Sequence, residues 1–479
     1  MKPFRIFLFV VATLFTLALL AWCFPAKGIS IGSLTIRFPN LREVLLPPKK
    51  HYADISGIIQ SSIKSETSVP DEAPPTVGSD SITPLDEKII RQKVEKIQYS
   101  PKYPHALDTF FLKLYKQQHK NHIVRILHYG DSQIEGDHVT RYLRTQLQNR
   151  FGGHGRGQIG LASISPVGGM NITEKKHWEV HSIIKPHHKK GILYGSTMSF
   201  LKAPDTLVLN NPHPFEVTIS LNGNQSHKAI LYCGTEGDNC SLQIYAGDSC
   251  ICTRHFPTPV LRTEQPFSIP SDTKELTIKT SSKVLLYSVS FQGNEGVLVD
   301  NIPLRGSAGL NFSDNTKESL AAMLHSQNVK LLIMQFGVNA VPEDPEEEIE
   351  NFGFYQTALT KELRYLKSLD PELCILVVGI SDRSRKIASG YQTNPNVLKI
   401  REAQRKAAFN AGCAYWDLFN AMGGENSMPS WVLHDPPLAN SDFIHFNGHG
   451  SQFVGELLYK SILYEYLDFI QRQKFAVSQ

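Results

Sequence analysis

Residues 122–150 read HIVRILHYGDSQIEGDHVTRYLRTQLQNR, and this stretch decides the fold. Residues 122–128 are a short apolar run typical of a buried strand, and residues 137–150 have a helical pattern. Between them, Gly130-Asp131-Ser132 places a serine at a strand-to-helix turn. The N–H groups at a helix start can stabilise a developing oxyanion there. Taken alone, the tripeptide also fits ordinary turn and capping chemistry.

Strand and helix patterns continue to alternate beyond this segment, which predicts a parallel sheet with helices on both faces. The other predicted strands are 296–302, 330–336, 374–380 and 413–419. The other predicted helices are 316–325, 346–369, 397–411 and about 450–472. The acidic run 343–348 is expected to begin the second of these helices, because negative charge complements the helix dipole.

The alternation is interrupted over residues 165–295, where short strands without helices predict an inserted β-sandwich. Residues 215–221 and 275–279 alternate strictly between apolar and polar side chains. Further strands are predicted at 227–232, 241–245 and 284–291. The predicted domains are therefore nested: 98–164 and 296–479 form one α/β domain, which the insert divides.

The composition sets the broad class of the protein. The chain has 479 residues, 41% of them hydrophobic, which supports two or three domains with real cores. The net charge of +4 is too balanced for a nucleic-acid binder, which normally carries a concentrated basic face. Only one apolar run is long enough to cross a bilayer, so a polytopic membrane protein is excluded.

That run is N-terminal, within the predicted segment 1–25, and it is a membrane anchor or an export signal. Residues 6–24 carry no charge and follow Lys2 and Arg5. Signal peptidase prefers small residues at the end of the apolar run, and here that end carries the bulky Trp22 and Phe24. An uncleaved anchor with its basic end inside is therefore favoured. Trp22 also argues against lipidation of Cys23. The polar stretch 26–97, with segments such as 61–67 and 71–76, is predicted to be a spacer.

The seven cysteines fit an exported protein with few disulfides. Cys233, Cys240, Cys250 and Cys252 lack the paired spacing of a zinc site, so one or two local disulfides are favoured over a metal. Cys374 and Cys413 lie in apolar stretches and are expected to be buried small hydrophobes.

A nucleophilic serine needs a base, and the base needs an orienting acid. Asp442-Phe443-Ile444-His445 stands before the last predicted helix, in a loop that a parallel α/β fold brings towards Ser132. His449 and His434 compete for the role of base. The run 185–190, which contains two histidines, is expected to be a solvated loop.

These segments resemble the four sequence blocks of the SGNH (GDSL-like) hydrolase family. Gly130-Asp131-Ser132 matches the first block and Asp442 to His445 the last. Gly306, after the strand 296–302, matches the second-block glycine, and Asn339 in Gly337-Val338-Asn339 matches the third block. All four occur in order and at strand ends, over the whole α/β portion. The resemblance implies a flavodoxin-like three-layer SGNH hydrolase fold, interrupted by the inserted all-β sandwich domain.

The resemblance also implies a role for each matched residue. Ser132 is the expected nucleophile, His445 the general base and Asp442 its partner, and the oxyanion hole is formed by Ser132 N–H, Gly306 N–H and the Asn339 amide. Ala340 replaces the family's third-block Asp, which puts the local support of Asn339 in doubt. No metal or organic cofactor is implied.

A narrower resemblance is to bacterial envelope esterases that remove O-acetyl groups from peptidoglycan and carry a carbohydrate-binding-module-like insert at the same place. Residues 152–157 and 417–424 also look like that group. The expected function is an exported carbohydrate O-acetylesterase in the periplasm, anchored in the inner membrane by the N-terminal segment. Its expected partner is an acylated polysaccharide, with no nucleic acid. An O-acyltransferase and a non-catalytic glycan-binding protein remain as alternatives.

Overall fold

The computed structural model describes residues 3–25, 29–31, 34–36, 52–60, 94–117, 122–205, 215–222, 227–344, 346–388 and 390–477. By its internal contacts the chain forms two units: Met1–Tyr52 with Lys386–Gln392, and Ala53–Arg385 with Thr393–Gln479. The spacer segments 61–67 and 71–76 lie outside the described residues.

The first unit contains the apolar helix α1 (Pro3–Cys23) and a short antiparallel pair, β1 (Ile29–Ile31) and β2 (Leu34–Ile36). Helix α1 is long and apolar enough to cross a membrane, and large apolar side chains such as Phe4 and Trp22 are exposed on it. A signal sequence has the same length and composition.

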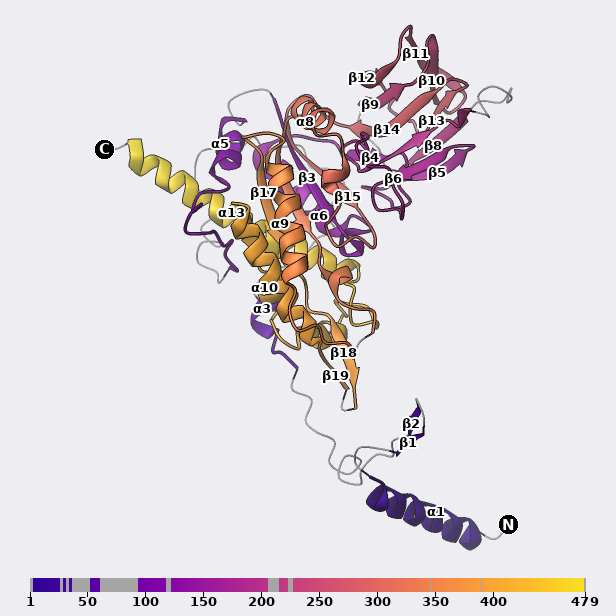
Figure 1. Cartoon of the computed structure of the whole chain (residues 1–479), viewed down its shortest axis with the longest axis vertical. Helices are drawn as coiled ribbons and strands as arrows, with labels where there is room; N and C mark the ends of the chain where they lie inside the picture. The colour runs from indigo at the N-terminus through magenta and orange to yellow at the C-terminus, as the bar shows by residue number, and fades with distance from the viewer. Residues whose placement is uncertain are drawn as a thin grey trace. The chain divides into compact units, whose positions relative to one another are not determined.

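The larger unit is built on a parallel sheet of the order β15-β3-β16-β17-β20, which puts the GDS-bearing strand second (Figure 1). The strands are β3 (Ile123–Gly130), β15 (Gly296–Pro303), β16 (Val329–Gln335), β17 (Cys374–Val378) and β20 (Ala414–Trp416). The last is shorter than predicted, because Asp417 caps a short helix, α11 (Leu418–Ala421), that follows at once.

Helices cover both faces of this sheet and complete the three layers that the sequence predicts. Along β3, Val124 and Ile126 face one side, while Leu127 and Tyr129 face the other, as the two-residue period of a strand requires. The first face is covered by α5 (Asp108–Gln117), α6 (His138–Phe151), α12 (Ser427–Leu433) and α13 (Gly448–Val477). The second is covered by α8 (Lys317–Ser326), α9 (Gly353–Lys367) and α10 (Pro395–Asn410).

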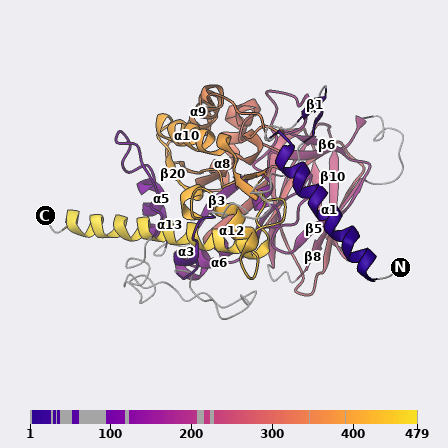
Figure 2. The same cartoon turned by 90° about the horizontal axis from the view of Figure 1, so that it is seen from below.

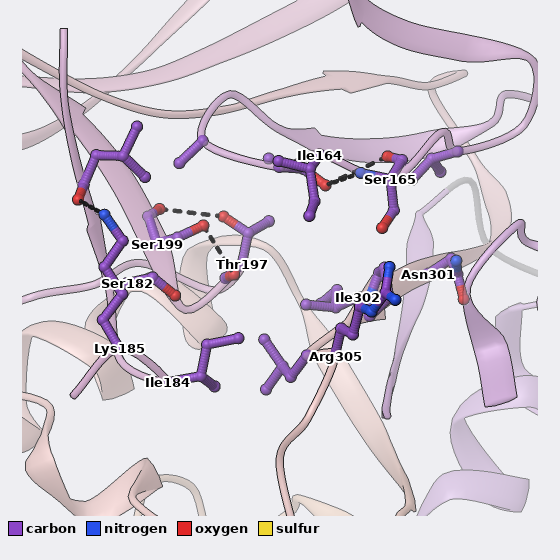
Figure 3. A pocket seen from close by; sticks show the side chains of 17 residues that line it. Ile164, Ser165, Ser182, Ile184, Lys185, Thr197, Ser199, Asn301, Ile302 and Arg305 are labelled. Atoms are coloured by element: carbon purple, nitrogen blue, oxygen red, sulfur yellow. Dashed lines mark hydrogen bonds between the residues drawn. The ribbon is translucent and has the colours of Figure 1, made fainter. Parts of the chain in front are cut away.

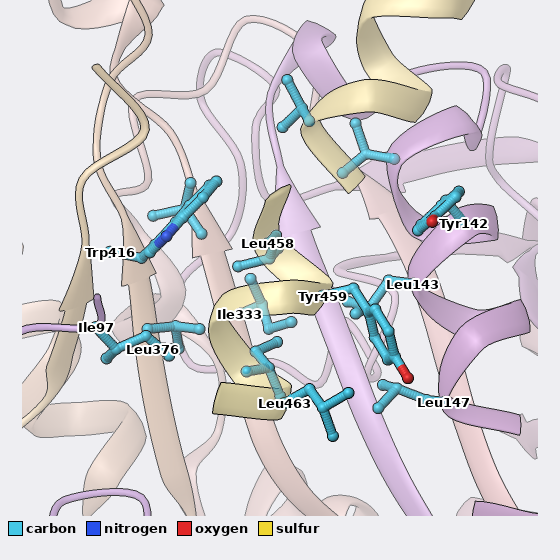
Figure 4. Close-up of a cluster of buried hydrophobic side chains, with 14 of the residues drawn as sticks. Ile97, Tyr142, Leu143, Leu147, Ile333, Leu376, Trp416, Leu458, Tyr459 and Leu463 are labelled. Atoms are coloured by element: carbon cyan, nitrogen blue, oxygen red, sulfur yellow. The ribbon is translucent and has the colours of Figure 1, made fainter. Parts of the chain in front are cut away.

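The core of the first face is apolar and continuous. Figure 4 shows Leu143 of α6 and Leu458 and Leu463 of α13 among the buried side chains of the sheet, which include Ile333 and Leu376. Figure 2 shows α13 as the long C-terminal helix that runs along this layer. Burial of each such side chain contributes about 1.5–3 kcal/mol.

Helix α9 begins at Gly353 and not in the acidic run 343–348, so this part of the helix prediction is wrong. The side chains there hydrogen-bond locally instead. Asp344 accepts the N–H of Glu346 at 2.9 Å, and Asn351 accepts the N–H of Gly353 at 3.1 Å. Such bonds offer the backbone an alternative to helix formation.

The insert consists of two antiparallel sheets packed around their own apolar core. One has the order β11-β10-β13-β8-β5; in the other, β12-β9-β14-β7-β6, strand β14 also pairs with β4. The first is made of β5 (Met170–Lys176), β8 (Phe215–Leu221), β10 (Cys240–Ala246), β11 (Ser249–Phe256) and β13 (Glu275–Thr280). The second is made of β4 (Gly157–Gly160), β6 (Glu179–Ser182), β7 (Ser199–Lys202), β9 (Lys228–Thr235), β12 (Val260–Ser268) and β14 (Val284–Phe291). The domain boundaries themselves stay a prediction.

The expected disulfides are not present, because all seven cysteines are free. The strand register explains this. Cys240 lies opposite Phe256 and Cys252 lies opposite Ile244, while Cys233 is on a strand of the other sheet, opposite Leu286. Burial raises the pKa of the Cys233, Cys374 and Cys413 thiols, as expected of small hydrophobes in a core.

Candidate active site

Ser132 lies at the carboxyl end of β3 and begins a 3₁₀ turn, η1 (Ser132–Ile134). The Asp131 side chain caps this turn by accepting the N–H of Gln133 at 3.0 Å. Helix α6 starts only at His138, after Asp137 in the left-handed region. Between the strand β3 and the helix α6, the predicted turn thus contains a capped 3₁₀ turn. Ser132 does not stand at the start of α6.

Ser132, His445 and Asp442 form a continuous hydrogen-bonded chain. Ser132 Oγ is 2.8 Å from His445 Nε2, and His445 Nδ1 is 2.8 Å from Asp442 Oδ2. Asp442 Oδ1 also accepts the backbone N–H groups of Ile444 and His445, at 2.9 and 3.0 Å. The loop before α13 thus presents the imidazole to the serine, with its carboxylate partner behind it.

The hydrogen bonds to Asp442 favour its ionised form. Burial pushes the pKa of this carboxyl upwards, but the bonds from His445 and the Ile444 N–H outweigh burial and hold the pKa below its usual value. A charged Asp442 can orient the imidazole and stabilise the imidazolium formed when His445 accepts a proton.

The competing histidine His434 takes another partner. His434 Nδ1 is 2.8 Å from the carbonyl oxygen of Pro436. Of the three C-terminal candidates, which all lie in the described part of the chain, His445 alone has a hydrogen bond to Ser132. The 185–190 run is exposed as expected, except that His188 forms a half-buried pair with Asp314, Nε2 to Oδ2 at 2.6 Å.

Gln133, which the sequence analysis did not single out, joins the serine turn to the histidine loop. Its Nε2 donates to the Ile444 carbonyl at 2.8 Å and to Ser381 Oγ at 3.2 Å, and its Oε1 accepts the N–H of Phe446 at 3.3 Å. This buried amide therefore holds the backbone on both sides of His445. Its position beside the serine was visible in the sequence, but its partners lie 248 to 313 residues away.

The two other predicted oxyanion donors lie on neighbouring loops. Gly306 follows β15 with φ +83°, and Asn339 is in the 3₁₀ turn η3 (Val338–Ala340) after β16. The Asn339 amide Nδ2 donates to the carbonyl of Ser307 at 3.1 Å, which ties the two loops together. Leu304 N–H donates to the Gly130 carbonyl at 2.7 Å and so ties the first loop to the serine strand.

Asp131 and Arg383 support the Asn339 loop from two sides, which the sequence analysis missed. Burial raises the pKa of Asp131 to about 7, against backbone hydrogen bonds from Gln133, Gly337 and Val338 that lower it. Arg383 Nη1 donates to the Val338 carbonyl at 2.8 Å. Burial lowers the pKa of Arg383, and the nearby charge of Asp442 opposes that shift. These contacts supply local support where Ala340 stands in place of an acid.

A solved structure matches this chain over most of its length. It is of a peptidoglycan O-acetylesterase "in action", with a TM-score of 0.61, 18% identity and coverage of 78% of this chain and 99% of that one. The chain has the SGNH hydrolase fold. An inserted all-β sandwich interrupts its parallel sheet, as the sequence predicts.

Other solved structures match the SGNH-fold chain less fully. A family two carbohydrate esterase from Cellvibrio japonicus has a TM-score of 0.23 and 9% identity, covering 65% of this chain and 98% of its own. A carbohydrate-binding module from Clostridium stercorarium in complex with cellobiose has a TM-score of 0.19 and 10% identity, covering 28% and 91%. No protein-family model and no curated protein matches this chain.

Proposed function

We propose that this chain is a serine esterase that removes O-linked acetyl groups from an envelope polysaccharide, namely peptidoglycan. The observation that carries the proposal is the Ser132–His445–Asp442 chain, with two distances of 2.8 Å. Such a chain is the arrangement that activates a serine hydroxyl as a nucleophile. A glycan-binding protein that uses the fold only as a scaffold would have no need of it.

In the proposed reaction, Ser132 Oγ attacks the acetyl carbonyl carbon while His445 Nε2 takes the hydroxyl proton. The tetrahedral oxyanion accepts hydrogen bonds from the N–H groups of Ser132 and Gly306 and from the Asn339 amide. The C–O bond to the sugar then breaks, and His445 returns the proton to the sugar oxygen. Water, deprotonated by His445, attacks the carbonyl carbon of the acetyl-serine. The bond between that carbon and Ser132 Oγ then breaks, His445 returns the proton to Oγ, and acetate is released.

The peptidoglycan substrate is proposed from the fold match to a peptidoglycan O-acetylesterase and from the apolar helix α1. We propose that α1 anchors the protein in the inner membrane, with the esterase in the periplasm. An exported esterase held at that surface would meet the glycan directly.

The test is a panel of acetyl esters incubated with the purified protein: p-nitrophenyl acetate, O-acetylated peptidoglycan and acetylated xylan. Released acetate and acetyl transferred to an added glycan acceptor are measured in the same reaction. Acetate release with peptidoglycan as the preferred substrate supports the proposal. Acetyl appearing on the acceptor in place of free acetate would identify an O-acyltransferase, and no reaction with any ester would refute the esterase.

A further inference from the structure

A cavity of roughly 250 Å³ lies where the insert meets the carboxyl end of β15 (Figure 3). Three chain segments enclose it: the turn after β4, the β6–β7 region and the end of β15. Figure 3 shows Ile164 and Ser165 on one side, Ile184 and Lys185 on another, and Arg305 between them. The insert and the parallel-sheet domain therefore build this cavity jointly.

The lining of the cavity is linked to the turn of the proposed nucleophile through Glu135, three residues after Ser132. Ser165 Oγ donates to Glu135 Oε1 at 2.8 Å, and Arg305 Nη1 is 3.6 Å from Glu135 Oε2. The N–H of Glu135 in turn donates to the Ser132 carbonyl at 3.3 Å. Arg305 also directly precedes Gly306, the proposed oxyanion donor. The cavity therefore lies next to the loop of the proposed oxyanion donor.

The lining combines apolar walls with positive charge. Carbon side chains such as those of Val180, Ile184 and Ile302 make up most of the surface, and Ile164 at the edge is 77% exposed. Clefts lined mainly by apolar side chains with a few polar or charged groups are typical of ligand sites.

Among the residues that the structure describes, two cations, Lys185 and Arg305, and no acid line the cavity. Arg305 is 66% exposed, and its 3.6 Å approach to Glu135 is too long for a hydrogen bond. Lys185 Nζ donates to the Val180 carbonyl at 2.6 Å, which leaves further ammonium donors for a ligand. An anionic group between Arg305 and Lys185 would meet two positive charges.

We propose that this cavity is a substrate subsite for a group that combines an apolar body with a carboxylate, carried by the glycan beside the sugar that bears the ester. The proposal rests on the proposed esterase function and deepens it, because it makes an acidic glycan the preferred substrate. The carboxylate can belong to the sugar itself or to a peptide attached to the glycan; both present the same chemistry to Lys185 and Arg305.

The test measures binding separately from catalysis. In the Ser132→Ala protein, the affinity for de-O-acetylated peptidoglycan fragments is determined by titration calorimetry. Three fragments are compared: one with a free sugar carboxylate, one with its peptide attached, and one with all carboxylates reduced to alcohols. We expect the reduced fragment to bind at least about tenfold more weakly than the tighter-binding of the two carboxylate fragments. Which of those two binds more tightly identifies the source of the carboxylate.

Variants then locate that binding. Lys185→Met removes one charge and Ile184→Trp fills the cavity; each is expected to weaken binding of the carboxylate fragments by about tenfold or more. Ser249→Trp, on an exposed strand of the other sheet of the insert, is the matched control and should bind as the parent does. Equal binding of the reduced fragment, or unchanged affinity in Ile184→Trp, would overturn the subsite. Because no turnover is needed, failure of the esterase proposal would be seen separately, as absence of acetate release by the wild-type protein.

Discussion

Each residue of the proposed triad depends on a hydrogen bond that a single substitution can remove. Asp442→Asn keeps the size of the side chain but cannot hold the imidazole through a charged acceptor. We expect kcat for p-nitrophenyl acetate to fall by at least about 10²-fold, with little change in KM, because the carboxylate acts on the transition state. Asp435→Asn, an exposed acid of the same loop, is the control and should retain full activity. A kcat within twofold of wild type for Asp442→Asn would remove Asp442 from the mechanism.

Gln133 acts at the same scale by fixing where His445 stands. Gln133→Leu keeps the volume but loses the bonds to the backbone of Ile444 and Phe446. Because each lost bond costs about 1 kcal/mol and leaves a buried backbone group unpaired, we expect kcat to fall about 10- to 100-fold while KM changes little. Gln146→Leu on α6 is the matched control. A rise in KM at constant kcat would mean that Gln133 contacts substrate and does not position His445.

At the scale of elements, β3, β16 and α6 are held together by the buried His128. Its Nε2 is 3.0 Å from Gln335 Oε1, and its Nδ1 is 2.9 Å from Thr140 Oγ1. Burial lowers the pKa of His128 to about 4, against interactions with Gln335 and Asp137 that raise it. In the unfolded chain, His128 has the ordinary histidine pKa of about 6.5. As the pH falls below that value, the unfolded chain binds a proton that the folded protein does not bind.

The contribution of His128 to stability is therefore complete above pH about 6.5 and is lost as the pH falls to about 4. The loss amounts to about 3 kcal/mol of the free energy of unfolding. His128→Gln can still hydrogen-bond to both partners but does not titrate in this range. Between pH 7 and pH 4 in urea titrations, we expect its free energy of unfolding to fall by about 3 kcal/mol less than that of wild type. His105→Gln, at an exposed site, is the control variant in the same titrations. Parallel pH profiles for wild type and His128→Gln would contradict this account of β3.

Elements were predictable from the sequence where burial was complete. The strands of the parallel sheet are continuous apolar runs, and they were found within a few residues of their ends. Edge strands were missed: β12 lies at the end of its sheet and contains Arg262, Glu264 and Pro266, and charged residues and proline are typical of edge strands. The residues of the proposed triad were predicted from short motifs. The support given by Gln133 to the histidine loop and by Asp131 to the Asn339 loop was not, because those partners are brought together only by the tertiary fold.

At the scale of the molecule, the insert and the parallel-sheet domain share a buried polar network. Arg125 of β3 donates to Asp300 of β15 at 2.8 Å and to Ser290 of β14 at 3.2 Å. Asp300 also accepts the backbone N–H of Gln158 in β4 at 3.1 Å. Arg125 and Asp300 are almost wholly buried, so leaving either charge without its partner costs several kcal/mol of folding free energy.

We expect Asp300→Ala to reduce the free energy of unfolding by about 3 to 5 kcal/mol, because it leaves Arg125 buried without its acid. The insert and the parallel-sheet domain should still unfold in one transition, with fluorescence and circular dichroism midpoints that coincide. Asp272→Ala, an exposed acid of the insert, is the control for denaturant titration. Loss of the insert alone at a lower midpoint would show that the network does not couple the two parts.

The central claim is that Ser132 is an esterase nucleophile, and the most direct measurement is acetate release from O-acetylated peptidoglycan by wild type and Ser132→Ala. Identical circular dichroism spectra and unfolding midpoints first establish that both proteins are folded. The account predicts steady acetate release by wild type and a fall of at least about 10³-fold in Ser132→Ala. Acetate release by Ser132→Ala at the wild-type rate would contradict it.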